Sequence, residues 1–217
     1  MNPALIELII LAGIAVFLFL RLRSVLGTRE GFEKPRMQPK NDAPKRDFKV
    51  IDGGEDKDIT DNVEKNSKSA KALKTIKEKD ETFTVNEFLS GARSAYEWIL
   101  MSFEKNEIDD IRELLSEEVA EAFDSVVEQR ISQGLTIEAE FIGVREMKLV
   151  DASYNSKTKT AEIAVSFIGE MTSVVKNSSG EIIEGDSKQI KRQKDTWTFS
   201  KDIKSSDPNW LLVATGE

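Results

Sequence analysis

Three side chains in this sequence could carry acid or base chemistry: Asp151, Tyr96 and Tyr154. Helices packed on a curved sheet often enclose an apolar pocket, and a carboxyl or phenol buried there has a shifted pKa. Asp151 precedes a predicted turn, however, which favours an exposed position. These residues therefore leave a small-molecule-binding or isomerase-type enzyme as an alternative hypothesis, with no catalytic residue assigned.

No motif in the sequence points to a metal or a cofactor. Histidine and cysteine are both absent from the 217 residues, which excludes disulfides, thiolate or imidazole ligands, and nucleophiles activated by histidine. Residues 180–187 have nearly the spacing of a phosphate-binding loop, but Asp186 stands where the lysine belongs. The acidic residues show no calcium-loop pattern. We therefore predict no metal site and no cofactor.

The charge balance argues against nucleic acid as a partner. Charged residues make up 32% of the chain, the formal net charge is -8 and the pI is near 4.9. Proteins that bind nucleic acid usually present a basic surface. We therefore expect other partners.

Residues 4–20 form one apolar run whose single charge, Glu7, lies near its outer end. As a helix this run would be about 26 Å long, close to the ~30 Å hydrocarbon core of a bilayer. A cleaved secretory signal is the competing interpretation, but no Lys or Arg precedes the run and no small-residue cleavage site follows it. We therefore predict a single transmembrane anchor over residues 4–20.

Basic residues lie only on the C-terminal flank of the apolar run. The positive-inside rule then predicts that the N-terminus lies outside and that the rest of the chain faces the cytoplasm. The same side chains are candidates for contact with anionic lipid at the membrane surface. They are Arg21, Arg23, Arg29, Lys34 and Arg36.

Residues 21–81 are rich in charged and small polar side chains and have too few apolar ones to bury a core. This composition predicts a charged, largely disordered linker. A short basic helix at residues 69–77 is an alternative, in which Leu73 and Ile76 would present an apolar edge to a membrane or a partner.

Residues 82–217 are long enough for one domain with its own core. Thr84 and Glu87 have the spacing of a capping box, and the apolar residues after them recur at steps of three and four, which predicts a helix. Two more helices are predicted: a short one at residues 108–115 and a longer one at residues 116–134.

Farther along the chain, apolar residues recur every second residue instead of about every 3.6 residues, which predicts strands. Residues 137–149 predict one strand with a bulge at Gly143, and residues 160–167 predict a second. Residues around 197–199 and 210–214 predict two more. The order of elements indicates an α+β domain with about three helices packed on a curved antiparallel sheet of about four strands.

The second half of the chain resembles the C-terminal domain of subunit forty-four of the mitochondrial inner-membrane import translocase and of its bacterial relatives. The matching segments occur in the family's order across residues 82–217. The strongest are Asp195-Thr-Trp-Thr-Phe-Ser-Lys-Asp202 and residues 205–215, joined by residues 88–96, 130–134 and 182–186.

This resemblance implies a cone-shaped fold similar to nuclear transport factor, with a large apolar pocket and a role at a membrane. In mitochondria the subunit links the translocation channel to the heat-shock-seventy chaperone motor, and its domain associates with cardiolipin-containing membrane. The present chain has the predicted anchor where the mitochondrial protein has a transit peptide and a long chaperone-binding region, which argues against chaperone recruitment. The resemblance therefore points to a single-pass protein of a bacterial inner membrane.

The leading hypothesis is a membrane-anchored adaptor that binds lipid or protein partners, in protein translocation, membrane-protein biogenesis or quality control. A ribosome tether is a third hypothesis, suggested by a mitochondrial branch of the same family and opposed by the acidic composition. The candidate pocket residues are apolar, and core packing is an equal alternative for each of them. They are Phe88, Tyr96, Ile99, Phe103, Phe167, Trp197 and Trp210.

Overall fold

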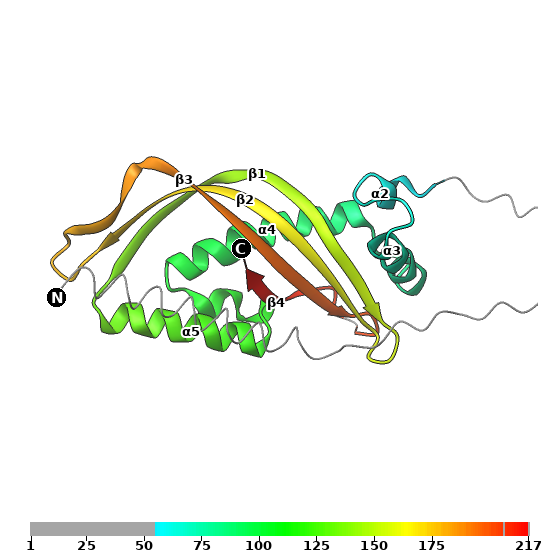
Figure 1. The fold of residues 1–217 in the computed structure, drawn as a ribbon. Helices are drawn as coiled ribbons and strands as arrows, with labels where there is room; N and C mark the ends of the chain where they lie inside the picture. The colour runs from blue at the N-terminus through cyan, green and yellow to red at the C-terminus, as the bar shows by residue number, and fades with distance from the viewer. Residues whose placement is uncertain (1–54, 206, 217) are drawn as a thin grey trace, which may run out of the picture. The chain divides into compact units, whose positions relative to one another are not determined.

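The structure is a computed structural model that describes residues 55–205 and 207–216 (Figure 1). It confirms an α+β domain in which helices accompany a four-stranded antiparallel sheet. The helices are α2 (Lys57–Thr60), α3 (Lys68–Lys79), α4 (Val85–Glu104), the 3-10 helix η1 (Ile108–Leu114) and α5 (Glu117–Ser132). The strands are β1 (Thr136–Asn155), β2 (Thr160–Lys176), β3 (Ile182–Asp202) and β4 (Leu211–Gly216).

The sheet has the order β1-β2-β3-β4, and its three long strands arch over α4 and α5 (Figure 1). β2 shows why one face is buried: Ala161, Ile163, Val165 and Phe167 alternate with more polar residues, and all four are fully buried. Successive side chains of a strand point to opposite faces, so this alternation places the apolar set toward the helices. The predicted second strand is therefore confirmed.

The long hairpin of β1 and β2 is irregular on the β1 side. The pairing register shifts between Phe141 and Gly143, as predicted from the glycine, and twice more farther along β1. Such shifts bend a strand and increase its twist. They account for the curvature of the arch.

β1 and β3 are both longer than the sequence predicts. β3 begins at Ile182, far ahead of the predicted stretch at residues 197–199. Residues 182–194, which we call the β3 arm, are all exposed, and five of them, Ile183 and residues 187–190, have no partner in β2. The arm lacks an apolar alternation because neither of its faces enters the core.

α3 is part of the folded domain, which therefore begins ahead of the predicted Thr82. Leu73 and Ile76 are fully buried in the core, and the Ser69 hydroxyl of α3 accepts a hydrogen bond from the Ala152 amide of β1 at 3.2 Å. Residues 57–60 and 68–79, predicted as linker, are helical. The alternative basic helix does form, but its apolar edge packs inside its own domain because β1 supplies a complementary surface.

The last strand joins the sheet to the middle of the chain. Leu212 of β4 forms a parallel bridge with Leu115, and its carbonyl accepts a hydrogen bond from the Ser116 amide at 2.9 Å. Ser116 also caps α5, as predicted, because its hydroxyl accepts from the Val119 amide at 3.3 Å. Residues on either side of the η1–α5 junction are thus held by β4.

The predicted anchor at residues 4–20 and the five basic residues after it lie outside the described residues. Among residues 55–205 and 207–216, no helix is both long enough and apolar enough to cross a bilayer.

Candidate functional site

A cavity of about 450 Å³ opens between the N-terminal half of α4 and the segment before β4. This volume is within the usual range of ligand pockets. Aromatic rings, small helix residues and a few polar groups form its wall, and we call it the aromatic cavity. Its lining residues are Asp80, Thr82, Phe83, Thr84, Glu87, Phe88, Gly91, Ala92, Ser94, Ala95, Trp98, Leu114, Phe199, Lys201, Pro208, Asn209 and Trp210.

Aromatic rings from distant parts of the sequence meet in this wall. The Trp210 ring lies 4.8 Å from that of Phe88 and 5.8 Å from that of Phe83, measured between centroids. Phe199 of β3 meets Phe88 edge-on at 6.0 Å. These separations are typical of favourable aromatic pairs. The rings hold one another in place, so this side of the cavity is formed by packing before any ligand arrives.

α4 presents a second stripe of residues to the cavity. Gly91, Ala95 and Trp98 recur at steps of four and three, so they lie on one face of the helix. The two small residues leave room beside the helix, and the Trp98 side chain at the far end is 53% exposed. The sequence prediction followed the more apolar stripe of α4 and missed this one. An aromatic residue off the main apolar stripe was the available signal.

The start of α4 is fixed by a capping interaction. The Thr84 hydroxyl accepts a hydrogen bond from the Glu87 amide at 3.2 Å, which confirms the predicted cap. The Glu87 carboxylate accepts from the Thr84 hydroxyl at 3.0 Å instead of binding a backbone amide. The cap therefore orients two residues of the cavity wall.

Asp58 of α2 supplies the remaining acceptors for the first turn of α4. Its carboxylate accepts from the amides of Val85 at 2.8 Å and Asn86 at 3.0 Å, and it pairs with Lys77 at 2.9 Å. Burial alone would raise the pKa of Asp58, but the bonds from the Val85 amide and Lys77 lower it below its ordinary value. α2 thus fixes the helix that carries half of the cavity wall.

An ion pair lies at the rim of the cavity. Asp80, just after α3, lies 3.3 Å from Lys201 of β3, and both side chains are largely buried. The Thr82 hydroxyl donates to Asp80 at 2.6 Å. This hydrogen bond is the main reason that the pKa of Asp80 is lowered, with partial burial opposing it and Lys201 adding to it. The pair neutralises both charges beside an otherwise apolar wall.

Three of the predicted pocket residues meet in the core and do not line the aromatic cavity. The Tyr96 ring stacks on Phe167 with 4.4 Å between centroids and 9° between planes. The centroid of the Trp197 ring lies 4.7 Å from that of the Tyr96 ring. A Cβ atom at Gly169 would come within 2.6 Å of the Tyr96 hydroxyl oxygen. The absence of a side chain at Gly169 thus makes space for the tyrosine.

The Tyr96 hydroxyl donates a 2.5 Å hydrogen bond to the buried Asp195 carboxylate. Burial, reinforced by this bond, raises the pKa of Tyr96 well above its ordinary value. Tyr96 therefore keeps its proton and acts as a buried donor. Gln193 donates to the other oxygen of Asp195 at 3.0 Å.

The remaining predicted pocket residues take different places. Phe88 and Trp210 line the aromatic cavity, whereas Ile99 is buried in the core. Phe103 packs against Phe123 at 4.5 Å between centroids. The Arg130 guanidinium lies 4.3 Å from the centre of the Phe103 ring.

The other two acid–base candidates also lie away from the cavity wall. Asp151 is exposed, as the sequence favours, and it accepts a hydrogen bond from the Ser69 hydroxyl at 2.9 Å. Tyr154 is partly buried against the core. Within the described ranges, no three acidic residues are placed to hold a metal ion.

Sequence reasoning also missed Phe83, Leu114 and Pro208, which line the cavity. Phe83 stands outside any periodic stretch, and Pro208 lies in a connection between two strands. Neither position carries a local pattern that predicts a binding wall. They come together through the tertiary fold.

Comparison with known proteins gives one family match. The family model of the Tim44-like domain matches residues 69–217, a range that begins inside α3. Among solved structures, the chain is similar to one titled "Crystal structure of intermembrane space region of chloroplast protein ARC6", with 8% sequence identity and a TM-score of 0.40. That likeness covers 59% of this chain and 94% of the other. No curated protein matches the chain.

Proposed function

This chain belongs to the Tim44-like domain family, and we propose that it is a membrane-anchored adaptor whose aromatic cavity binds apolar side chains of a protein partner. Domains of this family are in general non-catalytic interaction modules associated with protein translocation. The proposal keeps this role as an interaction module and assigns the binding to the aromatic cavity.

The observation that supports the proposal is the aromatic wall itself. Tryptophan and other aromatic residues are the usual anchors of protein interfaces, where they contribute large contact areas at low entropic cost. Trp98 is half exposed beside the pair formed by the buried Phe88 and the partly buried Trp210. Thr82 and Asn209 add polar groups to the same wall, which suits a peptide that must satisfy its backbone.

The location of the protein forms part of the same proposal. The apolar run at residues 4–20 would anchor it in a bacterial inner membrane with a single span, and the basic flank would keep the domain in the cytoplasm. Partners would then be membrane proteins or chains in translocation, with anionic lipid near Arg21 and Arg23. This part of the proposal is supported by the apolar run and its basic C-terminal flank in the sequence.

Site-specific photo-crosslinking in bacterial cells tests the proposal with the full chain. A photoreactive amino acid at Trp98 should give adducts with other proteins. The matched control is Ile131 on α5, which is 63% exposed and outside the cavity wall. Protein adducts from position 98 that are absent from position 131 would support the proposal. Lipid adducts alone, or the same adducts from both positions, would contradict it.

The isomerase-type alternative gains no support from the cavity. Its three candidate groups, Asp151, Tyr96 and Tyr154, are absent from the lining. Of the three charged lining residues, Asp80 and Lys201 pair with each other, and Glu87 accepts a hydrogen bond from the Thr84 hydroxyl at 3.0 Å. An acid or base for catalysis must reach the substrate within about 3 Å, and none of the three predicted groups lies in the cavity wall.

A further inference from the structure

One edge of β3 has no neighbouring strand among residues 55–205 and 207–216. β4 pairs with β3 from Ser200 to Thr196, where Gly216 is its last partner. Residues 191–194 continue the same edge of β3, and on their other side they pair with β2 in unbroken register. A regular strand with one unpaired edge presents alternate amides and carbonyls that can bind a further strand.

The opposite edge of the sheet, formed by β1, is irregular and partly covered by a helix. β1 changes register three times along its length, and α3 packs on it through Ser69 and Ala152. Bulges and covering helices are the usual means by which proteins prevent strand addition. Within the described residues, 191–194 have neither a register shift nor a covering helix, although the irregular residues 187–190 adjoin them, so 191–194 form the open edge of the sheet.

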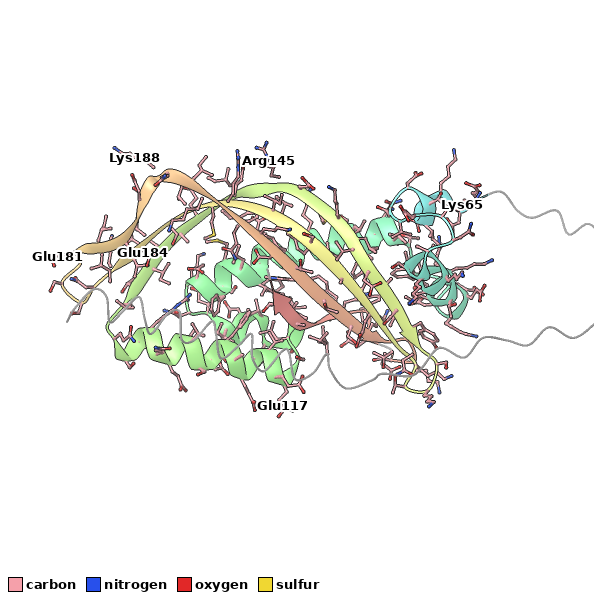
Figure 2. All side chains as sticks on the ribbon, in the orientation of Figure 1. Lys65, Glu117, Arg145, Glu181, Glu184 and Lys188 are labelled. Carbon is pink, nitrogen blue, oxygen red and sulfur yellow. The ribbon has the colours of Figure 1, made fainter. Side chains whose placement is uncertain are left out.

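This open edge carries a dense positive charge. Residues 188–194 contain four lysine or arginine residues and no acidic residue, in a chain with a net charge of -8. All seven residues are exposed, and Ile190 among them is 53% exposed. In Figure 2 Lys188 projects from the convex side of the arch, away from the helices.

Part of this charge is already paired. Arg192 lies 2.9 Å from Glu170, and Lys191 lies 3.8 Å from Glu184. In the described part of the chain, Lys188 and Lys194 have no carboxylate within 4.0 Å, although Lys194 is close enough to Glu146 to contribute to its lowered pKa. Neither lysine is held in an ion pair, so both can meet the carboxylates of a partner.

The unpaired edge identifies the kind of partner. Lys194 lies opposite Ile168 on the face away from the helices, and Lys188 projects on the same side (Figure 2), so the two lysines share one face. An anionic membrane would meet these charges but would leave the amides and carbonyls of residues 191–194 unpaired. A strand added at the edge pairs with this backbone and presents its carboxylates on the face of the lysines.

We propose that residues 188–194 are a strand-addition site for an extended acidic segment of a partner protein. The backbone of the segment would pair with the free edge of residues 191–194, next to β4. Its carboxylates would meet Lys188 and Lys194, and an apolar side chain would cover Ile190. This site lies outside the lining of the aromatic cavity. The strand-addition proposal can therefore be tested independently of the proposed function.

A peptide titration tests this site on the full chain in detergent. The probe is a capped, fluorescently labelled peptide of alternating glutamate and valine, about eight residues long, near the usual length of a strand. The double variant Lys188→Glu/Lys194→Glu should bind it about tenfold more weakly, because two attractions become repulsions. The matched control is Lys71→Glu/Lys74→Glu, which makes the same charge change at exposed positions of α3. It should change the dissociation constant less than about twofold.

A second probe separates strand pairing from simple charge attraction. The same peptide with N-methyl groups on alternate residues keeps its charges but loses the donors that a sheet requires, so its binding should also fall about tenfold. No binding of the parent peptide, or equal binding of the N-methylated one, would overturn the proposal. So would a double variant that loses binding to phosphatidylglycerol vesicles while it keeps binding to the peptide, because the site would then be a lipid contact.

Discussion

The two ends of the same sheet are built in opposite ways. At the aromatic cavity, rings from three distant segments bury one another against α4. In the β3 arm the strand is paired with β2 over most of its length, yet its side chains are exposed and largely charged. Backbone pairing thus maintains the shape of the arm, while side-chain packing stabilises the cavity end. The first end should be sensitive to substitution, and the second should tolerate it.

The largest expected difference comes from truncating one apolar side chain at each end. Phe88→Ala should lower the free energy of unfolding by about 3 to 4 kcal/mol, because it removes a buried ring and leaves a void. Ile182→Ala in the arm, where the side chain is 56% exposed, should cost at most about 0.5 kcal/mol. Urea unfolding followed by circular dichroism measures both. Equal losses would mean that the arm is packed as tightly as the cavity end.

Two glycines sharpen the comparison within the cavity half. Gly169→Ala should destabilise the protein by about 2 kcal/mol, because the new methyl group would collide with Tyr96 and disturb its bond to Asp195. Gly91→Ala is the matched control, since nothing lies within 4 Å of its added Cβ, and it should stabilise α4 by roughly 0.5 to 1 kcal/mol. Thermal unfolding of the two variants should shift in opposite directions. A shift in the same direction would contradict the close approach of Gly169 to Tyr96.

A smaller and pH-dependent effect is expected where α2 caps α4. Asp58→Ala should lower the free energy of unfolding by about 1 kcal/mol near neutral pH, because two amides lose their acceptor. The pKa of Asp58 is lower in the folded state, so its contribution is present above the ordinary value of 3.8 and disappears as the pH falls through the lower folded value. The difference between variant and parent should therefore shrink in acid.

Urea unfolding at neutral and acidic pH checks this dependence. Asp109→Ala serves as the control, because the Asp109 side chain is 93% exposed and its loss should change stability little at either pH. A destabilisation by Asp58→Ala that stays constant across the acidic range would contradict the assigned cause.

The smallest effect on folding is expected from a substitution on the β3 arm. Lys194→Glu should change the free energy of unfolding by no more than about 0.5 kcal/mol, because exposed charges contribute little to stability. The same substitution should still alter binding at the open edge. A large loss of stability would show that the arm supports the core and is not a free binding surface.

Local patterns predicted the elements whose own residues decide them. Thr84 and Glu87 marked the start of α4, the alternation at residues 160–167 marked a strand with one buried face, and Gly143 marked a bulge. Each of these signals is complete within a few residues. The α+β class followed from their order.

The features that were missed depend on contacts between distant residues. Leu73 and Ile76 are two apolar positions among lysines, and only β1 makes them core. The β3 arm has no apolar alternation because neither of its faces enters the core, so its pairing with β2 left no signal in the sequence. The aromatic cavity was placed only in part, at Phe88 and Trp210, since its other walls come from segments that the fold brings together.

The position of Trp210 and Leu212 also has a consequence for the time course of synthesis. Domains are made from the N-terminus at about 5 to 20 residues per second, and α4 emerges from the ribosome long before β4. Until Leu212 bonds to Ser116 and Trp210 covers Phe83 and Phe88, the nascent chain displays an uncovered aromatic surface. The aromatic wall of the cavity is therefore completed only after β4 has been made.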